Sequence, residues 1–311
     1  MGTKVERRCR AAMTLIEWQK KFSSVKDCHT FLVNQRWPHG FVCPVCGHLE
    51  AWLIHRQDRK DIDLYECKSC RRQTTVTAGT VFHRSKVPLP VWFLAIYLVA
   101  IDKRGVAALT LARELGVAYH TAWLLHHKIQ QAMADRNAQY KLGGLIELDD
   151  AYFGGVSHGP GKRGRGTDQD PVVVGVSLDA LGHPTFGFLE KIPDVTNDSI
   201  LEVLKRRVEA QTVWRTDGAA AYAAAAPTLE ADLRVTPSTS PDAAEVFHWV
   251  NVFISNAKAF LDGTYHGRGR ARRQLYFEEY SYRYNRRRFG SQLPNRLLAA
   301  CLGAPPHPYA R

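Results

Sequence analysis

Two Cys-x-x-Cys pairs lie near the start of the chain, and their spacing is typical of a metal site. Twenty residues separate the pairs, which fits a zinc ribbon with four thiolate ligands: Cys43, Cys46, Cys67 and Cys70. Four thiolates complete a tetrahedral shell around Zn²⁺ and leave no position for water. The sequence therefore predicts a structural Zn²⁺ site that performs no chemistry itself.

Two aspartates in the second half of the chain each end a strand-like segment. Asp149 ends LIELD, and Asp217 ends TVWRTD. Carboxylates are hard oxygen ligands suited to Mg²⁺ or Mn²⁺, and two such ions can assist in-line displacement at a phosphodiester. Aspartate is also common at strand ends as a turn former, which explains either residue taken alone. The pair together favours a metal-dependent site for phosphoryl transfer.

A third segment, which begins at His248, is predicted to be a helix. Its apolar residues recur at threes and fours and form one face: Val250, Phe253, Ile254, Ala257 and Leu261. Asn251, Ser255 and Lys258 share another stripe of the same helix. An amphipathic surface helix with a polar face explains this pattern equally well.

The elements expected around the two aspartates follow the order β-β-β-α-β-α, which suits an α/β core with a mixed sheet. Apolar and β-branched residues predict strands within residues 142–155, 171–179 and 184–192. Residues 197–211 have helical spacing, and residues 212–217 form a strand that runs into another helix.

The first half of the chain has a different pattern. Residues 15–32 have helical spacing, residues 51–81 favour short strands, and residues 88–134 form a helical region divided at Gly105.

The end of that helical region reads as helix, turn at Gly116, helix. This order resembles a helix-turn-helix, in which the second helix reads base edges in the major groove. Tyr119, His120 and Trp123 lie on the second helix and are candidates for such contacts. A plain pair of packed helices explains the pattern equally well.

The chain of 311 residues is strongly basic, with 42 Lys and Arg against 30 Asp and Glu and a net charge of +12. Such an excess favours a polyanionic partner, most often nucleic acid. A solvated face is the usual alternative for a run of charges. We predict DNA contacts by basic residues that flank the candidate site: Lys162, Arg163, Arg165, Arg268, Arg270, Arg286 and Arg287.

No segment has the length of a membrane span. The longest apolar run, residues 91–101, is shorter than the about 20 residues that a spanning helix needs. No apolar stretch follows the basic N-terminal residues, as it does in a secretory signal. We therefore expect no membrane contact and a cytoplasmic, nucleoid-associated location, where Cys-x-x-Cys pairs favour metal over disulfides.

As an ordered set, the motifs resemble DDE-type insertion-sequence transposases with an N-terminal zinc ribbon and an ISXO-like catalytic core. The resemblance extends over residues 22–288 and rests on FSSVKDCHTFLVNQRWPHGFVCPVCG, CKSCRRQTTVTAGTVFH, IELDDAYFGG, WRTDGAAAY, NAKAFLDGTYHG and YRYNRR. It implies an RNase H-like core that cleaves DNA at element ends and joins the 3′-OH to target DNA. The implied partners are terminal inverted repeats and target DNA, bound by a homodimer or a larger synaptic assembly.

The resemblance also implies the roles of individual residues. Asp149 and Asp217 match the first and second catalytic carboxylates, and Asn251 matches the third position. Lys258 matches the lysine that follows the third position and contacts DNA phosphate. Together, Asp149, Asp217 and Asn251 are the implied ligands of a catalytic Mg²⁺ or Mn²⁺.

Asn251 is a departure, because most DDE enzymes have glutamate at this position. An amide oxygen can bind Mg²⁺ but brings no charge, so we expect weaker metal binding. Nearby acids are candidates to compensate: Asp150, Asp242 and Glu245. Two other functions remain open, namely a zinc-ribbon DNA-binding regulator or decayed transposase with a silent core, and a nuclease that does not join strands.

Four parts are expected along the chain. Residues 1–85 form an N-terminal helix and the zinc ribbon, and residues 86–140 form a helical, helix-turn-helix-like DNA-binding segment. Residues 141–290 form the RNase H-like α/β catalytic core, and residues 291–311 form a C-terminal tail.

Overall fold

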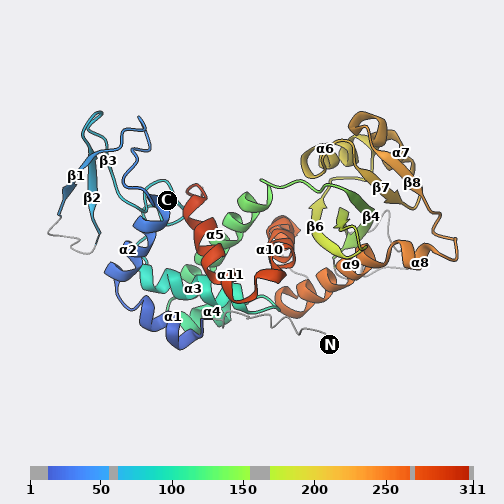
Figure 1. Ribbon diagram of the computed structural model, residues 1–311. Coiled ribbons are helices and arrows are strands. Elements are labelled where there is room, and N and C mark those ends of the chain that lie inside the picture. The colour runs from blue at the N-terminus through green and yellow to red at the C-terminus, as the bar shows by residue number, and fades with distance from the viewer. Residues whose placement is uncertain (1–12, 56–61, 155–168, 267–269, 308–311) are drawn as a thin grey trace, which may run out of the picture. The chain divides into compact units, whose positions relative to one another are not determined.

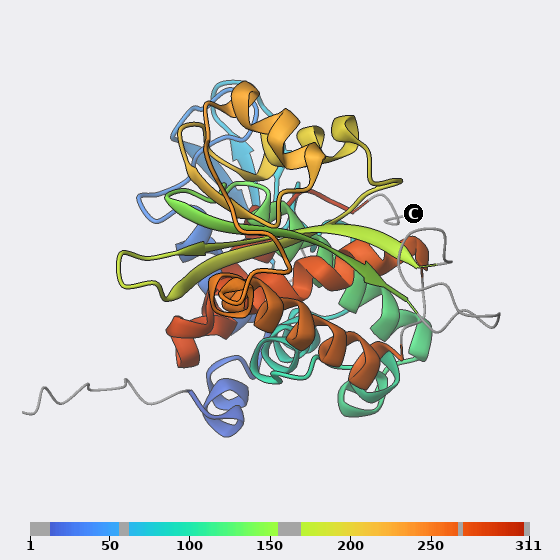
Figure 2. The same cartoon turned by 90° about the vertical axis from the view of Figure 1, so that its right-hand side faces the viewer.

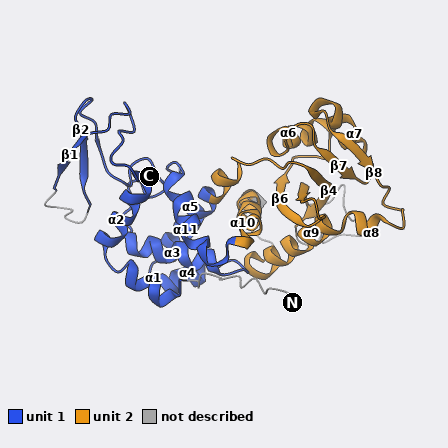
Figure 3. Ribbon diagram, in the orientation of Figure 1, with its two compact units in different colours: residues 1–132, 289–311 blue, residues 133–288 orange. Residues whose placement is uncertain are grey.

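The computed structural model describes residues 13–55, 62–154, 169–266 and 270–307 (Figure 1). The chain divides into two compact units, which Figure 3 shows in different colours. Unit 1 comprises Met1–Ala132 and Phe289–Arg311, and unit 2 comprises Met133–Arg288. Within the described residues, no helix is both long enough and apolar enough to cross a bilayer.

Unit 1 contains a small antiparallel sheet of three strands in the order β1-β2-β3. The strands are β1 (Ala51–Ile54), β2 (Leu64–Cys67) and β3 (Gln73–Thr74). The rings of Trp37, Phe41 and Tyr65 pack at 4.9 to 5.5 Å beside this sheet. The predicted short strands of a ribbon are therefore present.

The remainder of unit 1 is helical. Its helices are α1 (Leu15–Lys21), α2 (Val25–Arg36), α3 (Leu89–Ile101), α4 (Ala108–Leu115), most of α5 (Tyr119–Asn137) and α11 (Leu293–Gly303). Residues 15–32, expected as one helical stretch, form two helices. The reason is local, because Thr14 and Ser24 each begin a capping box that starts a new helix.

Helices α4 and α5 have the predicted order of helix, turn and helix. Gly116 ends α4 in the left-handed conformation with φ of 63°, which glycine adopts without steric cost. At the start of α5, Tyr119 is 55% exposed and His120 is also exposed, whereas Trp123 is half-buried. The first turn of α5 therefore presents Tyr119 and His120 to solvent.

The C-terminal residues differ from the tail that the sequence predicts. Helix α11 packs against α2 and α3 within unit 1. Its Leu297, Leu298 and Cys301 are completely buried. The expected tail thus contains a helix that belongs to the hydrophobic core of unit 1.

Unit 2 is built on a mixed sheet of five strands in the order β6-β5-β4-β7-β8 (Figure 2). The strands are β4 (Leu145–Phe153), β5 (Asp170–Leu178), β6 (Pro184–Lys191), β7 (Val213–Thr216) and β8 (Asp232–Val235). The first three pair antiparallel, whereas β4 pairs with β7 and β7 pairs with β8 in parallel. This confirms the predicted α/β fold with an RNase H-like mixed sheet.

Helices cover both faces of this sheet (Figure 2). Helices α6 (Asn197–Arg207) and α7 (Ala220–Ala225) cover one face, and α9 (His248–Phe260) and α10 (Arg273–Asn285) cover the other. Shorter helical turns connect them: η1 (Ala226–Leu229), α8 (Ala243–Val246), η2 (Leu261–Tyr265), η3 (Arg270–Arg272) and η4 (Arg287–Gln292).

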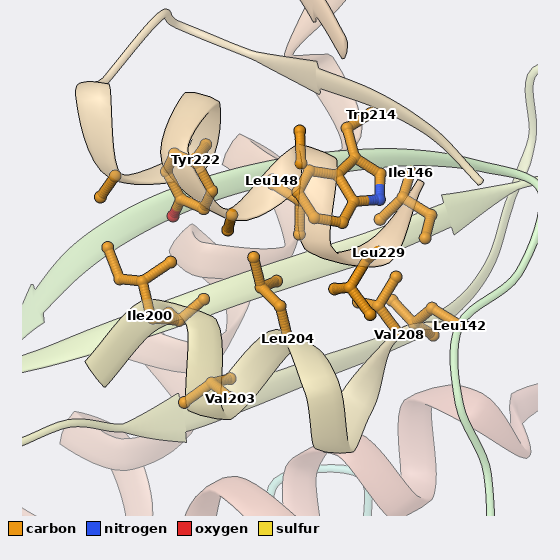
Figure 4. Close-up of a cluster of buried hydrophobic side chains, with 14 of the residues drawn as sticks. Leu142, Ile146, Leu148, Ile200, Val203, Leu204, Val208, Trp214, Tyr222 and Leu229 are labelled. Carbon is orange, nitrogen blue, oxygen red and sulfur yellow. The ribbon is translucent and has the colours of Figure 1, made fainter. Parts of the chain in front are cut away.

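Alternate residues of β4 face the two layers, as the period of a strand requires. Ile146 and Leu148 pack with Trp214 against α6 and α7 (Figure 4). Ala151 and Phe153 pack instead in the cluster that contains α9 and Phe277 of α10. The even-numbered residues of β4 thus face α6 and α7, and the odd-numbered residues face α9.

The predicted apolar face of α9 is buried throughout, from Val250 to Leu261. Its central residue, Phe253, packs directly over Gly187 of β6, where a Cβ atom would lie 2.9 Å from the ring. Helix α9 can approach the sheet closely because Gly187 has no side chain. This packing fixes the helix that carries Asn251 and Lys258.

Candidate active site

The four cysteines of the ribbon converge on one centre. All four Sγ atoms lie within 4.8 Å of one another, and the Cys43–Cys70 and Cys46–Cys67 pairs are each 3.6 Å apart. A tetrahedral Zn²⁺ with Zn–S bonds of about 2.3 Å separates its sulfurs by about 3.8 Å. In the described parts of the chain, no other group of three or more potential His, Cys, Asp or Glu ligands is this close.

The turn between the first two cysteines favours the thiolate form. Backbone N–H groups of Cys46 and Val45 point at the Cys43 sulfur and lower the pKa of this thiol to about 6. Thiolates are the form that binds zinc. The donor type, the spacing and the turn geometry therefore all fit a closed zinc site.

The two predicted catalytic carboxylates lie at the same end of adjacent parallel strands. Asp149 is on β4, and Asp217 directly follows β7. The register pairs Glu147 of β4 with Arg215 of β7, two residues before each aspartate. Continued by two residues, this register brings Asp149 and Asp217 side by side at this edge of the sheet.

The pKa of Asp149 reflects the burial of its carboxyl group and the charges around it. Burial raises the pKa of Asp149 to about 6, and the negative charges of Asp150 and Asp217 raise it further. The Asp150 amide, which donates to Asp149 Oδ1 at 2.8 Å, and the positive charge of Lys258 act in the opposite direction. Asp149 thus lies within electrostatic range of both Asp217 and Lys258.

Helix α9 lies along β4. At its start, the Val250 amide donates to Glu147 Oε2 at 2.8 Å. Near its end, the Lys258 ammonium is 5.5 Å from the ring centroid of Phe153, the last residue of β4. Asn251 directly follows Val250, and both Asn251 and Lys258 are exposed. The start of α9, where Asn251 lies, thus contacts β4 through Glu147, and Lys258 lies near the end of the same strand.

A divalent cation fits the character of this cluster. The repulsion among Asp149, Asp150 and Asp217 is the kind that a bound cation relieves, and carboxylates are ligands that Mg²⁺ and Mn²⁺ prefer. The fully buried hydroxyl of Tyr222 (Figure 4) finds no hydrogen-bond partner among the described residues. Burial and the charges of the same three aspartates raise the pKa of Tyr222 well above its usual value. A buried hydroxyl beside carboxylates fits a site completed by a cation and its water.

Gly218 allows the chain to turn immediately after Asp217. Its φ is +95°, and a Cβ atom would lie 2.8 Å from Val235 Cγ1 of β8. We expect Gly218→Ala to displace Asp217, to lower stability by about 1–3 kcal/mol and to reduce the function of the site. Thermal unfolding and DNA cleavage measure the two effects.

Gly182 provides the matched control for Gly218. It also has a positive φ, +77°, but no atom lies within 4 Å of its Cβ position. Gly182→Ala should cost stability while cleavage remains near the wild-type level. Equal losses of cleavage in both variants would show that Gly218 has no specific role beside Asp217.

Glu147 is a residue of this site that the sequence did not single out. It is 1% exposed, and burial raises its pKa to about 7 even though it accepts the amides of Val250 and Trp249. The available signal was its position, because Glu147 is the only charged residue of the segment LIEL and precedes Asp149 by two. Such a residue shares a strand face with Asp149.

The acids considered as substitutes for a third carboxylate lie in different places. Asp150 is half-buried on β4 and follows Asp149. Asp242 and Glu245 are exposed, the first preceding α8 and the second within it. None of them joins Asp149 and Asp217 in a compact three-acid group among the described residues.

The predicted DNA-contacting residues are only partly described. Lys162, Arg163, Arg165 and Arg268 lie outside the described residues. Arg270 begins η3. Arg287 is exposed, and its guanidinium donates to the carbonyls of Thr185, Tyr284 and Pro184.

Arg286 differs from its predicted role as a surface contact, because it is only 7% exposed. Its guanidinium lies 3.8 Å from the ring centroid of Tyr282 and donates to Asn137 Oδ1 and the Tyr282 carbonyl. The flat, delocalised cation suits this stacked site. Arg286 therefore stabilises the interior of unit 2.

Two family models match the chain. Residues 141–285 match the ISXO2-like transposase domain, and residues 24–73 match the transposase zinc-ribbon domain. A curated relative from Halobacterium salinarum, described as an uncharacterized protein in transposable element ISH50, is 31% identical over 221 residues. The match covers 65% of this chain and 70% of the relative.

Solved structures of Mos1 transposase are more distantly similar. The pre-cleavage Mos1 transpososome has 13% identity and a TM-score of 0.28 over 63% of this chain and 73% of that chain. The Mos1 paired-end complex with the left transposon end has 13% identity and a TM-score of 0.23 over 67% and 77%. The Mos1 mariner paired-end complex with Mn has 11% identity and a TM-score of 0.25 over 63% and 74%.

Proposed function

The chain belongs to the family of insertion-sequence transposases with a zinc ribbon and an ISXO2-like domain, and on that premise we propose that it is a DDE-type enzyme. It cleaves DNA at the ends of its element and joins the freed 3′-OH to target DNA. The observation that best supports this proposal is the placement of Asp149 beside Asp217 at adjacent strand ends, within electrostatic range of Lys258.

We assign the site residues as follows. The carboxylates of Asp149 and Asp217 and the amide oxygen of Asn251 hold Mg²⁺ or Mn²⁺ at the edge of β4 and β7. When bound, the ions activate the attacking oxygen and stabilise the leaving oxygen. Lys258 binds a DNA phosphate beside them and orients the strand.

The reaction consists of two phosphoryl transfers. In the first, water oxygen bonds to phosphorus at the element end, and the bond from phosphorus to the 3′-oxygen breaks and leaves a 3′-OH. In the second, that 3′-OH attacks a target phosphodiester, loses its proton and displaces the target 3′-oxygen. Positioning and charge stabilisation dominate such reactions, because the side chains form no covalent intermediate.

Double-stranded DNA is the partner that we propose. The net charge of +12 favours a polyanion, and the exposed start of α5 is suited to read base edges. An element has two ends, and each end requires a catalytic site, so we propose a homodimer or a larger synaptic assembly. The ribbon binds a structural zinc ion.

One assay separates this proposal from its alternatives. Purified protein is incubated with Mg²⁺ or Mn²⁺, labelled element ends and a target plasmid, and the products are resolved as bound, nicked and joined DNA. Joined product supports a transposase. Nicking without joining would instead indicate a nuclease, and binding without cleavage would indicate a DNA-binding regulator with a silent core.

Asn251 offers a direct test of the third ligand. Asn251→Glu adds a charged oxygen ligand at the same place, so we expect the half-saturating Mg²⁺ concentration for cleavage to fall by about tenfold, which is 1.4 kcal/mol. Asn251→Ala should raise that concentration. Metal titrations of cleavage measure both variants.

Asn256→Glu is the matched control, since Asn256 is also exposed on α9 but does not lie on the stripe of Asn251 and Lys258. The control should leave the metal requirement unchanged. An unchanged metal requirement in both Asn251 variants would exclude Asn251 from the metal site.

A further inference from the structure

We propose that Glu147 is a positioning residue whose buried carboxylate fixes the start of α9 on β4 and so sets Asn251 in place relative to Asp149. The proposal rests on the proposed function for the roles of Asn251 and Asp149. The contact itself is independent of that function.

The contact supplies a cap that α9 otherwise lacks. Phe247 is the N-cap residue of α9 and makes no side-chain hydrogen bond, so no capping side chain satisfies the first amides of the helix. Glu147 Oε2 accepts the Val250 amide at 2.8 Å, and its carboxylate also accepts the Trp249 amide. A negative charge at this position is also favourable to the helix dipole.

Glu147 connects the proposed ligands Asp149 and Asn251 through few intervening atoms. Glu147 and Asp149 are two residues apart and therefore lie on the same face of β4. Val250 and Asn251 are adjacent on α9. The Glu147 carboxylate thus joins the backbone next to Asn251 to β4, the strand that carries Asp149.

A purely structural cap would not need this arrangement. Serine, threonine or aspartate at position 247 would satisfy the first amides from within the helix, and an apolar residue at position 147 would match Ala151 and Phe153, which are buried on the same face of β4. The chain instead buries a carboxylate, which is costly unless it is well bonded. The two amides and the charge of Arg215 on β7 offset part of this cost.

Two variants of Glu147 distinguish loss of the hydrogen-bond acceptor from loss of the negative charge. Glu147→Ala removes the acceptor, so we expect Mn²⁺ binding, followed by electron paramagnetic resonance, to weaken by about tenfold or more. Hydrogen exchange of the first turn of α9 should accelerate in the same variant. Glu147→Gln retains one acceptor oxygen and should bind Mn²⁺ within about threefold of wild type.

Glu278→Gln is the control for the loss of a buried carboxylate. Glu278 of α10 is 5% exposed and accepts from Asn137 and Arg207. This variant should lose stability and keep wild-type Mn²⁺ binding. If Glu147→Ala does not fold, Glu147→Gln still decides: because it keeps only one acceptor oxygen, hydrogen exchange in the first turn of α9 should be faster than in Glu278→Gln. Exchange no faster than in Glu278→Gln would overturn the positioning role.

The outcomes distinguish this inference from the proposed function. Faster exchange at α9 with unchanged Mn²⁺ binding in Glu147→Ala would reduce Glu147 to a helix cap and overturn its positioning role. Unchanged hydrogen exchange in Glu147→Ala would show that the contact between Glu147 and α9 does not stabilise the start of the helix. Wild-type protein that binds no Mn²⁺ at all would contradict the proposed function, while the exchange data would still test the link between β4 and α9.

Discussion

Asp149→Asn is expected to reduce DNA cleavage by at least about a thousandfold, the scale on which loss of an electrostatic group in a phosphoryl-transfer site acts. The substitution keeps the shape of the side chain but removes the charge that we assign to metal binding. Single-turnover cleavage of a labelled element end in Mg²⁺ measures the loss.

The same substitution should not destabilise the protein without metal. Burial and the charges of Asp150 and Asp217 raise the pKa of Asp149 to about 6, so the ionised carboxylate is unfavourable in its site. A neutral amide removes this repulsion, and we expect a melting temperature equal to or above that of wild type. Loss of activity with retained stability is a combination that misfolding does not produce.

Asp232→Asn is the matched control for Asp149→Asn. Asp232 is on β8 of the same sheet, but it is exposed and pairs with Arg234. Its substitution should leave cleavage within about threefold of wild type. Cleavage by Asp149→Asn within tenfold of wild type would remove Asp149 from the catalytic site.

Removal of zinc has the second largest expected effect, because apparent binding free energies of four-ligand zinc sites are about 10–16 kcal/mol. Chelation, or Cys67→Ser, should unfold the ribbon around β1 to β3. Unit 2 contains none of the four ligands and should keep its fold. Zinc content by mass spectrometry and limited proteolysis of the ribbon measure these changes.

Cys301→Ala is the control for the cysteine substitution. Cys301 is completely buried in α11 and is remote in sequence from the four ligands. We expect this variant and wild type alike to retain one zinc ion per chain. A ribbon that resists proteolysis equally with and without chelator would contradict a folding role for the metal.

The parts of the fold that local pattern determines were predictable. Apolar runs and alternation located β4, β5 and β6, and the spacing of Val250 to Leu261 predicted the buried face of α9. The Cys-x-x-Cys spacing predicted four converging thiolates, because each pair needs only a short turn. These features depend on residues that are close in sequence, so the sequence alone predicts them.

The features that escaped prediction depend on tertiary contacts. Arg286 belongs to a basic run, but its guanidinium is buried against Tyr282 and Asn137, and a run of charges does not reveal burial. Glu147 bonds to amides 102 and 103 positions further along the chain. Helix α11 looked like a tail because its burial depends on α2 and α3.

We propose that Asp149, Asp217 and Asn251 surround one metal site, although they come from β4, the end of β7 and α9. Protein loaded with Fe²⁺ in place of Mg²⁺ and treated with ascorbate and peroxide generates hydroxyl radicals that cut the backbone beside the ion. We expect cuts near all three residues, and we expect both an excess of Mg²⁺ and the Asp149→Asn substitution to abolish them. Cuts confined to one of these segments, or unchanged in Asp149→Asn, would contradict this proposal.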